Sequence, residues 1–195
     1  ESDFVRAAAE KKHAAAVYTQ NVDGVRAKKA YFFDENAVYL LGAAIDSDSP
    51  YPVATTVNVA RKNGNVIKGA DWGWHDGIGY KGARLQIAEG VRNGDWGIVS
   101  GGLAKPAPFS AELFSVGVEH GTGVKGGSYA VAVLPGASPE ETARFELRIL
   151  ANTPSLQAVQ FADGTAGAVF HEAGKLGSFE TKEPGVFLIP AENLK

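Results

Sequence analysis

The residues best suited to chemistry lie between Asp71 and Tyr80, where two tryptophans, a histidine, two aspartates, a tyrosine and three glycines fall within ten positions. Indole rings can stack on the apolar faces of sugar rings, and neighbouring polar groups can bind sugar hydroxyls. Glycines let the backbone turn sharply and present such side chains. We therefore expect a carbohydrate-binding surface made from Trp72, Trp74, His75, Tyr80, Arg84 and Trp96. The alternative is a buried tryptophan pair around a tight turn, because large aromatic residues usually belong to a core.

The histidines raise the question of acid–base catalysis. His75 precedes Asp76, and a carboxylate beside an imidazole makes the imidazole a stronger base. Neighbouring residues of a strand point to opposite faces, however, so these two side chains need not touch. His120 precedes Gly121 near an expected hairpin, where a structural hydrogen bond is favoured over catalysis. No catalytic constellation surrounds the other two histidines.

A pair of aspartates suggests a calcium site. Asp46 and Asp48 lie two positions apart in an expected loop, and Glu35, Asp71 and Asp76 are further candidate ligands. Calcium takes six or more oxygen ligands, often from alternating aspartates. An ordinary turn is favoured, because no complete calcium-loop pattern follows. The four histidines fit no zinc spacing, and no nucleophile-elbow, phosphate-loop or dinucleotide pattern occurs. Apart from calcium, we expect no cofactor.

Composition narrows the class of protein. The chain has 195 residues, of which 45% are hydrophobic and 21% charged, and its formal net charge is -3. Nothing suggests a nucleic-acid partner or a polybasic membrane contact, and no apolar run is long enough to span a bilayer. Cysteine is absent, which excludes disulfides and thiolate metal sites. Methionine is absent even at position 1, so we expect a processed or excised chain.

Short runs of β-branched and aromatic residues bounded by turn residues predict a mainly antiparallel β-sandwich, in one domain over residues 1–195. The expected strands are 14–18, 27–33, 37–44, 54–59, 79–86, 96–99, 112–119, 128–133, 155–161, 165–171 and 185–189. Ser138 is expected to begin a short helix, with Pro139 at its first position and Glu141 at the capping-box spacing. The Ala-rich run 5–16 favours a short N-terminal helix, the alternative being a segment reshaped for a chain that lacks the preceding domain.

Several motifs occur in an order that is found in a known family. They are residues 29–35 (KAYFFDE), 38–42 (VYLLG), 55–58 (TTVN), 74–80 (WHDGIGY), 119–122 (EHGT), 129–136 (YAVAVLPG), 140–142 (EET) and 151–154 (ANTP). Together they resemble the later part of the β-supersandwich of the family 8 polysaccharide lyases, which include hyaluronate, chondroitin AC and xanthan lyases. The resemblance runs from about Tyr18 to about Ile189.

This resemblance implies a connection with enzymes that remove the C5 proton of a uronic acid and eliminate the C4 oxygen. In that family the catalytic Asn, His, Tyr and Arg lie on an α/α-toroid domain, and no residue of this chain matches them. Residues 1–17 diverge from the family pattern, and residues 183–195 are a candidate exit into a missing C-terminal domain. We therefore expect no catalytic residue in this chain.

Two functions remain open from the sequence. As part of a polysaccharide lyase, the chain would form a wall of the substrate cleft, contact an acidic polysaccharide or oligosaccharide, work with a separate α/α-toroid catalytic domain, and be inactive alone. Alternatively, it is a free-standing glycan-binding or structural β-sandwich module without activity. The resemblance also implies an extracytoplasmic location, either secreted or periplasmic.

Overall fold

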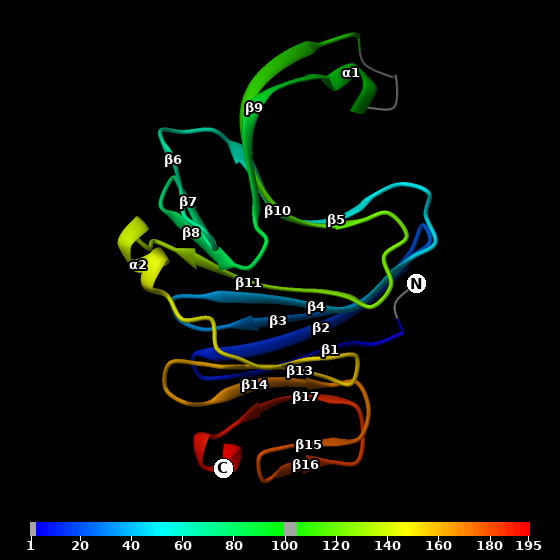
Figure 1. Ribbon diagram of the computed structural model, residues 1–195, viewed down its shortest axis with the longest axis vertical. Coiled ribbons are helices and arrows are strands. Elements are labelled where there is room, and N and C mark those ends of the chain that lie inside the picture. Colours follow the sequence, from blue (N-terminus) through cyan, green and yellow to red (C-terminus); the bar gives the residue numbers. More distant parts are fainter. Residues whose placement is uncertain (1–2, 100–104) are drawn as a thin grey trace.

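Antiparallel β-sheets make up most of the molecule, as the sequence predicts (Figure 1). The computed structural model describes residues 3–99 and 105–195. An eight-stranded sheet forms the central layer, a three-stranded sheet covers part of one face, and a four-stranded sheet packs on the other face. The predicted β-sandwich is therefore confirmed. No helix in the described part of the chain has the length and apolar character needed to cross a membrane.

The central sheet has the strand order β1-β2-β3-β4-β11-β8-β7-β6. Its strands are β1 (Val5–Glu10), β2 (His13–Val22), β3 (Val25–Phe33), β4 (Val38–Ser47), β6 (Val66–Lys68), β7 (Trp72–His75), β8 (Ile78–Gly82) and β11 (Gly127–Pro135). Each strand pairs antiparallel with its neighbours. The first four strands form a continuous meander, and β11 returns from a distant part of the chain to pair with both β4 and β8.

The outer layers are smaller. The three-stranded sheet contains, in order, β5 (Val53–Arg61), β10 (Pro108–Gly121) and β9 (Gln86–Asp95), and helix α1 (Trp96–Val99) follows β9. The four-stranded sheet contains β12 (Ile149–Asn152), β13 (Leu156–Gln160), β14 (Ala166–Phe170) and β17 (Gly185–Ile189). Beside it lie the hairpin β15 (Gly174–Leu176) and β16 (Phe179–Thr181) and the 3-10 helix η1 (Ala191–Leu194).

Helix α2 (Pro139–Arg144) links β11 to the four-stranded sheet, and it begins as the sequence predicts. The Ser138 hydroxyl accepts the Glu141 N–H at 3.1 Å, and the Glu141 carboxylate accepts the Ser138 N–H at 2.7 Å. This capping box satisfies two backbone donors that the first helical turn leaves unpaired. The predicted helix start at Ser138 is confirmed.

Alternating side chains of the central sheet bury both of its faces. Phe32 on β3 joins a core with Val169 of the four-stranded sheet. On the opposite face, Ile45 on β4 packs in a second core with Val118 of β10. These side chains are almost fully buried, and burial of each such apolar side chain contributes roughly 1.5–3 kcal/mol. The central strands are therefore apolar on both faces, where a one-sided sheet would alternate with polar residues.

Three local predictions are wrong. The Ala-rich run 5–16 forms strands β1 and β2 around a turn at Lys11 (φ 52°), because strand pairing and burial of Ala15 and Val17 outweigh the helix preference of alanine. Residues 96–99 form α1 instead of a strand, and Oδ1 of Asp95 accepts the Gly97 N–H at 2.7 Å. The expected strand 79–86 is divided by a turn at Arg84 (φ 60°).

Two side-chain amides, those of the half-buried Asn152 and the buried Gln157, connect the four-stranded sheet to the central sheet. Nδ2 of Asn152 donates to the carbonyls of Gly42 and Tyr129, at 3.1 and 2.9 Å. The β4–β11 register shifts beside this pair of residues. Gln157 is fully buried; its Nε2 donates to Oδ1 of Asn152, and its Oε1 lies 3.0 Å from Nε2 of His171. The amides thus occupy acceptors and donors that would otherwise be buried without partners.

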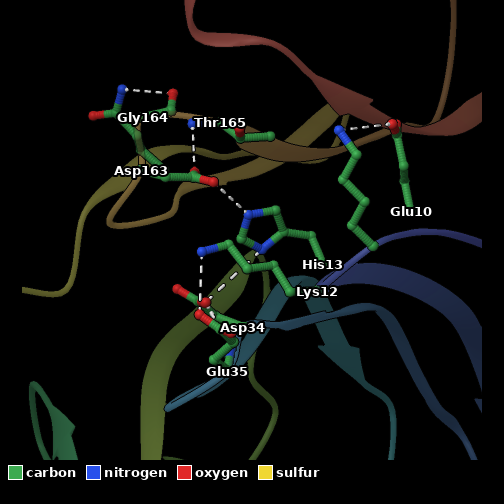
Figure 2. A network of polar contacts seen from close by, with 10 residues as sticks. Glu10, Lys12, His13, Asp34, Glu35, Asp163, Gly164 and Thr165 are labelled. Atoms are coloured by element: carbon green, nitrogen blue, oxygen red, sulfur yellow. Dashed lines mark hydrogen bonds and ion pairs between the residues drawn. The ribbon is translucent and has the colours of Figure 1, made fainter.

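His13 makes a second connection between these layers (Figure 2). Its Nε2 lies 2.9 Å from Oδ2 of Asp163, in the turn between β13 and β14, and its ring stacks on Phe161 with centroids 4.3 Å apart. Nδ1 of His13 lies 3.8 Å from Oδ1 of Asp34 and has no hydrogen bond to any described residue. The hydrogen bonds from His13 and the Thr165 N–H lower the pKa of Asp163 to about 2.

Asn152→Ala should destabilise the fold. The substitution leaves two strand carbonyls and the buried Gln157 amide short of partners, and each such loss costs about 1–3 kcal/mol. We expect the urea midpoint to fall by an amount equivalent to at least ~2 kcal/mol. The exposed Asn65 provides the matched control, and Asn65→Ala should leave the midpoint unchanged. Equal midpoints for the two variants would contradict the role given to the amide chain.

Ionisation of Asp163 should make the stability of the fold depend on pH in the acidic range. Because its pKa is lower in the folded chain than the ordinary value of 3.8, the ionised carboxylate stabilises the fold above pH 4 and loses this effect as the pH falls toward 2. The pair is partly exposed, so we expect only about 0.5–1 kcal/mol. Asp163→Asn keeps the side-chain shape and removes the charge. The urea midpoints of the variant and the parent should differ at neutral pH and become equal in acid. A difference that does not change with pH would contradict the role given to the Asp163 carboxylate.

Candidate functional site

The aromatic segment predicted to bind sugar forms a tight hairpin of β7 and β8. Asp76 and Gly77 are its two turn residues, with φ of 49° and 77°, as in the type I′ turns that join twisted strands. Along β7 the side chains alternate, so His75 lies on the side that faces the three-stranded sheet, while Trp72 and Trp74 lie on the other. The hairpin therefore divides the predicted residues between two faces.

His75 and Tyr80 are buried, and their assignment as carbohydrate-binding residues is wrong. His75 is 2% exposed, stacks on Phe114 with centroids 4.3 Å apart, and accepts the Asn63 N–H at Nε2 over 2.9 Å. Tyr80 is fully buried, and its hydroxyl accepts a hydrogen bond from Nδ2 of Asn58 at 2.5 Å. Burial also raises the pKa of Tyr80. Both side chains are core residues with satisfied polar atoms, so neither can reach a polysaccharide.

Trp72 and Trp74 are half-buried against structural neighbours. Nε1 of Trp74 donates to the Ala137 carbonyl at 2.7 Å, beside the start of α2. The Trp72 indole lies against Gly69, where a Cβ atom would sit 1.9 Å from Nε1 of Trp72. Both indoles thus hold the hairpin in place, and their role in sugar binding stays a prediction.

The remaining two candidates lie elsewhere. Trp96 of α1 is 59% exposed and stacks on Phe109 of β10, with ring centroids 5.2 Å apart. In Figure 1, α1 lies at the outer end of β9 and β10, away from β7 and β8. The guanidinium of Arg84 donates to the carbonyl of Ser128 in β11 at 2.8 Å. The six predicted residues therefore do not form one site.

The aspartates considered for calcium have other partners. Oδ1 of Asp48 lies 2.7 Å from Nζ of Lys125, its Oδ2 lies 3.3 Å from Arg26, and these cations lower the pKa of Asp48. Oδ1 of Asp46 accepts the Gly126 N–H at 2.9 Å. In the described part of the chain, no three acidic or histidine side chains come together as metal ligands. The two aspartates stabilise loops, and the calcium alternative is not supported.

A different group of residues, which sequence reasoning missed, meets on the central sheet. Tyr18, Lys29, Gly42 and Tyr129 are consecutive cross-strand neighbours on β2, β3, β4 and β11. The Tyr129 ring packs directly against Gly42. A Cβ atom at position 42 would lie only 2.1 Å from Cε1 of Tyr129, so the ring needs the glycine. Tyr31 follows Lys29 on the same face of β3. We call the half-buried Tyr18, Lys29 and Tyr31, together with the neighbouring buried Tyr129, the tyrosine face.

The charges around the tyrosine face are positive. Lys29 is half-buried, and desolvation lowers the pKa of its ammonium group. Burial lowers the pKa of His120, and the charges of Arg84 and Lys29 lower it further. The ring of His120 lies 6.0 Å from that of Tyr129, and Nε2 of His120 lies 2.9 Å from the Thr55 hydroxyl. The arrangement favours an anion over a cation, because cationic groups gather here and Lys29 forms no ion pair with a carboxylate among the described residues.

Comparison with known proteins connects this fold to a family. The profile of the polysaccharide lyase family 8 super-sandwich domain matches residues 1–146, and that of the family's C-terminal beta-sandwich domain matches residues 148–193. The two profiles meet near Leu147, between α2 and β12. The expectation of a single domain over residues 1–195 stays a prediction.

Individual relatives agree with the profiles. Chondroitinase-AC of Pedobacter heparinus is 32% identical over 100% of this chain and 32% of its own length, and the hyaluronate lyase of Thermasporomyces composti is 27% identical over 85% of this chain and 25% of its own length. The chain thus spans about a third or less of the relatives that it matches.

Solved structures extend the comparison. A structure of chondroitinase AC lyase, studied in enzyme–oligosaccharide complexes, superposes with a TM-score of 0.89 over 99% of this chain and 33% of that chain, at 32% identity. Streptomyces coelicolor A3 chondroitin AC lyase in complex with chondroitin sulphate gives a TM-score of 0.84 at 27% identity, over 92% of this chain and 26% of that chain. The sequence and the fold together establish that this chain belongs to polysaccharide lyase family 8.

Proposed function

We propose that this chain is the sandwich portion of a polysaccharide lyase and binds an acidic polysaccharide without cleaving it. The observation that carries this proposal is the similarity of the whole chain to one third of chondroitinase-AC. A relative of this family has a structure in complex with chondroitin sulphate, which supports an acidic sugar polymer as the ligand. On this proposal the sandwich forms one wall of the substrate cleft, and a separate α/α-toroid domain supplies the chemistry.

The side chains of this chain support a non-catalytic role. Proton removal next to a carboxylate needs a base that reaches the substrate and a cation or donor that stabilises the developing negative charge. His75 and His13 are buried and already have polar partners. Burial lowers the pKa of His171 to about 4, and its Nε2 contacts Gln157. Each of these three histidine side chains therefore already has a polar partner inside the protein.

Trp96 supports the second candidate function, that of a glycan-binding module able to act alone. Its indole and the ring of Phe109 form an exposed aromatic pair at the end of the β9–β10 hairpin. Exposed aromatic pairs of this kind provide flat faces on which a sugar ring can stack. This function needs no other domain.

We also propose an extracytoplasmic location, in keeping with action on a polymer outside the cell.

The purified chain should not cleave chondroitin, hyaluronan or xanthan. Ultraviolet absorbance of the unsaturated uronate product measures the elimination directly, and we expect no rise above a heat-inactivated sample. The partly exposed histidines are the ones that a substrate can approach, so His120→Ala and His171→Ala are the informative variants. Product formation by the parent chain that disappears in either variant would contradict the non-catalytic role.

Trp96→Ala should weaken binding of a chondroitin sulfate oligosaccharide if the exposed aromatic pair holds sugar. A ring-stacking contact contributes about 0.5–1.5 kcal/mol, so the dissociation constant should rise roughly 2- to 12-fold. Val91→Ala is the matched control, because Val91 is also exposed on the same hairpin. Calorimetric titration with thermal midpoints measures both properties. Unchanged affinity of Trp96→Ala would remove this hairpin from the binding surface.

A further inference from the structure

The tyrosine face lies where the layers of the sandwich do not overlap. The core beneath the three-stranded sheet includes Ile45, Tyr129 and Val131 of the central sheet, and reaches β3 at Ala27. Further along, Phe32 points to the opposite core, so its neighbour Tyr31 must point away from it. Tyr18, Lys29 and Tyr31 are only half-buried. A ligand can therefore reach these three side chains beside the edge of the three-stranded sheet.

Lys29 differs from the strand lysines whose ammonium groups have a partner: Lys28 and Lys68 donate to the carbonyls of Pro154 and Ile87, at 2.6 and 3.1 Å. Lys62 and Lys125 each bind a carboxylate, with distances of 3.2 and 2.7 Å to Glu112 and Asp48. Lys29 has no ion pair with any carboxylate in residues 3–99 and 105–195. A partly desolvated ammonium without a counter-ion is costly, and an anion that binds beside it recovers part of this cost.

The neighbours of Lys29 add to the attraction for an anion. Arg84 and Lys29 both lie close enough to lower the pKa of His120 through their charges, so three basic groups share one region. Tyr18 is the cross-strand neighbour of Lys29 on one side, and Gly42, covered by the Tyr129 ring, is the neighbour on the other. Cross-strand neighbours have Cβ atoms about 5 Å apart. Tyr18 and the ring of Tyr129 therefore lie at the two positions across the sheet from Lys29.

Phenol rings and an ammonium suit one class of ligand particularly well. A tyrosine ring packs on the apolar face of a sugar, and its hydroxyl exchanges hydrogen bonds with sugar hydroxyls. A lysine binds the carboxylate or sulfate of that sugar through a charge-assisted hydrogen bond. An inorganic anion would use the lysine alone and leave the half-buried rings of Tyr18 and Tyr31 without a role.

We propose that the tyrosine face binds an acidic sugar unit, with Lys29 contacting its carboxylate or sulfate and Tyr18 and Tyr31 packing against its ring. The site rests on the proposed function, since it gives the sandwich a specific surface for the acidic polymer. It is separate from the aromatic pair of Trp96 and Phe109 at the hairpin end. Arg84 and His120 supply positive potential beside the site, and they need not touch the ligand.

The test compares charge removal at two lysines. Lys29→Met keeps the length of the apolar stem and removes the charge, while Lys175→Met does the same on the exposed hairpin strand β15. Both chains are titrated calorimetrically with a chondroitin sulfate tetrasaccharide, and their thermal midpoints are recorded. We expect Lys29→Met to weaken binding about tenfold, the effect of one charge-assisted hydrogen bond, and Lys175→Met to bind like the parent. Lys29→Arg should recover most of the affinity.

A second pair of titrations separates a sugar site from a site for any anion. Sodium sulfate and sodium glucuronate are compared with the tetrasaccharide while the Lys29 and tyrosine NMR signals are followed. Tyr31→Leu should weaken binding of the tetrasaccharide but not of sulfate. If sulfate alone moves the Lys29 signal as strongly as the tetrasaccharide and the tyrosine signals stay fixed, the sugar assignment is overturned. These parent-chain signals also decide the question if Lys29→Met fails to fold.

The outcomes distinguish this site from the broader proposed function. Equal tetrasaccharide affinity of the parent and Lys29→Met overturns the tyrosine face, while the proposed function survives if Trp96→Ala still weakens binding. Absence of any tetrasaccharide binding by the folded parent overturns both. If Lys29 instead responds only when a carboxylate-bearing protein segment is added, the face is a protein contact and the sugar assignment is wrong.

Discussion

The central sheet must bury both of its faces, and most other features of the molecule follow from this requirement. Its strands carry apolar side chains in alternation toward two different outer sheets. Eight strands are covered on one side by only three, however. Tyr18, Lys29 and Tyr31 of the central sheet are only half-buried. The surface that we propose for the ligand thus follows from the unequal sizes of the layers.

The same requirement explains why the chemically conspicuous side chains His75 and Tyr80 are buried and have internal partners. In a sandwich with two cores, inward-pointing polar residues need internal partners. His75 has Asn63 and Phe114, Tyr80 has Asn58, and Gln157 bridges Asn152 and His171. Each polar side chain serves the packing of layers. Lys29 is the contrasting case, because it is partly withdrawn from water and has no carboxylate among the described residues.

Strands were predictable where alternation and turn residues agree, as in β3, β4 and β11, and so was the capping box at Ser138. The helix propensity of alanine gave the wrong prediction at residues 5–16, because pairing with neighbouring strands outweighs that propensity in the folded chain. The sequence could not tell which face of the β7–β8 hairpin would be covered, because that depends on Phe114, about 40 positions away in the chain. The burial of His75 and Tyr80 could therefore not be predicted from the sequence.

The tyrosine face was partly visible in the sequence. The spacing of Lys29 and Tyr31 places both side chains on one face of a strand. The contribution of Tyr18, Tyr129 and His120 depends on strand register and on the overlap of two sheets, which periodicity cannot reveal. Family membership gave the class of protein, yet the positions of the accessible groups came only from the packing of the layers.

A crystal structure of this chain with a chondroitin sulfate tetrasaccharide would test the central claim most directly. We expect density for an acidic sugar on the tyrosine face, with a carboxylate or sulfate oxygen within hydrogen-bond distance of Nζ of Lys29. Density only elsewhere on the molecule, with Lys29 unchanged, would contradict the claim that the uncovered part of the central sheet is where this sandwich meets its ligand.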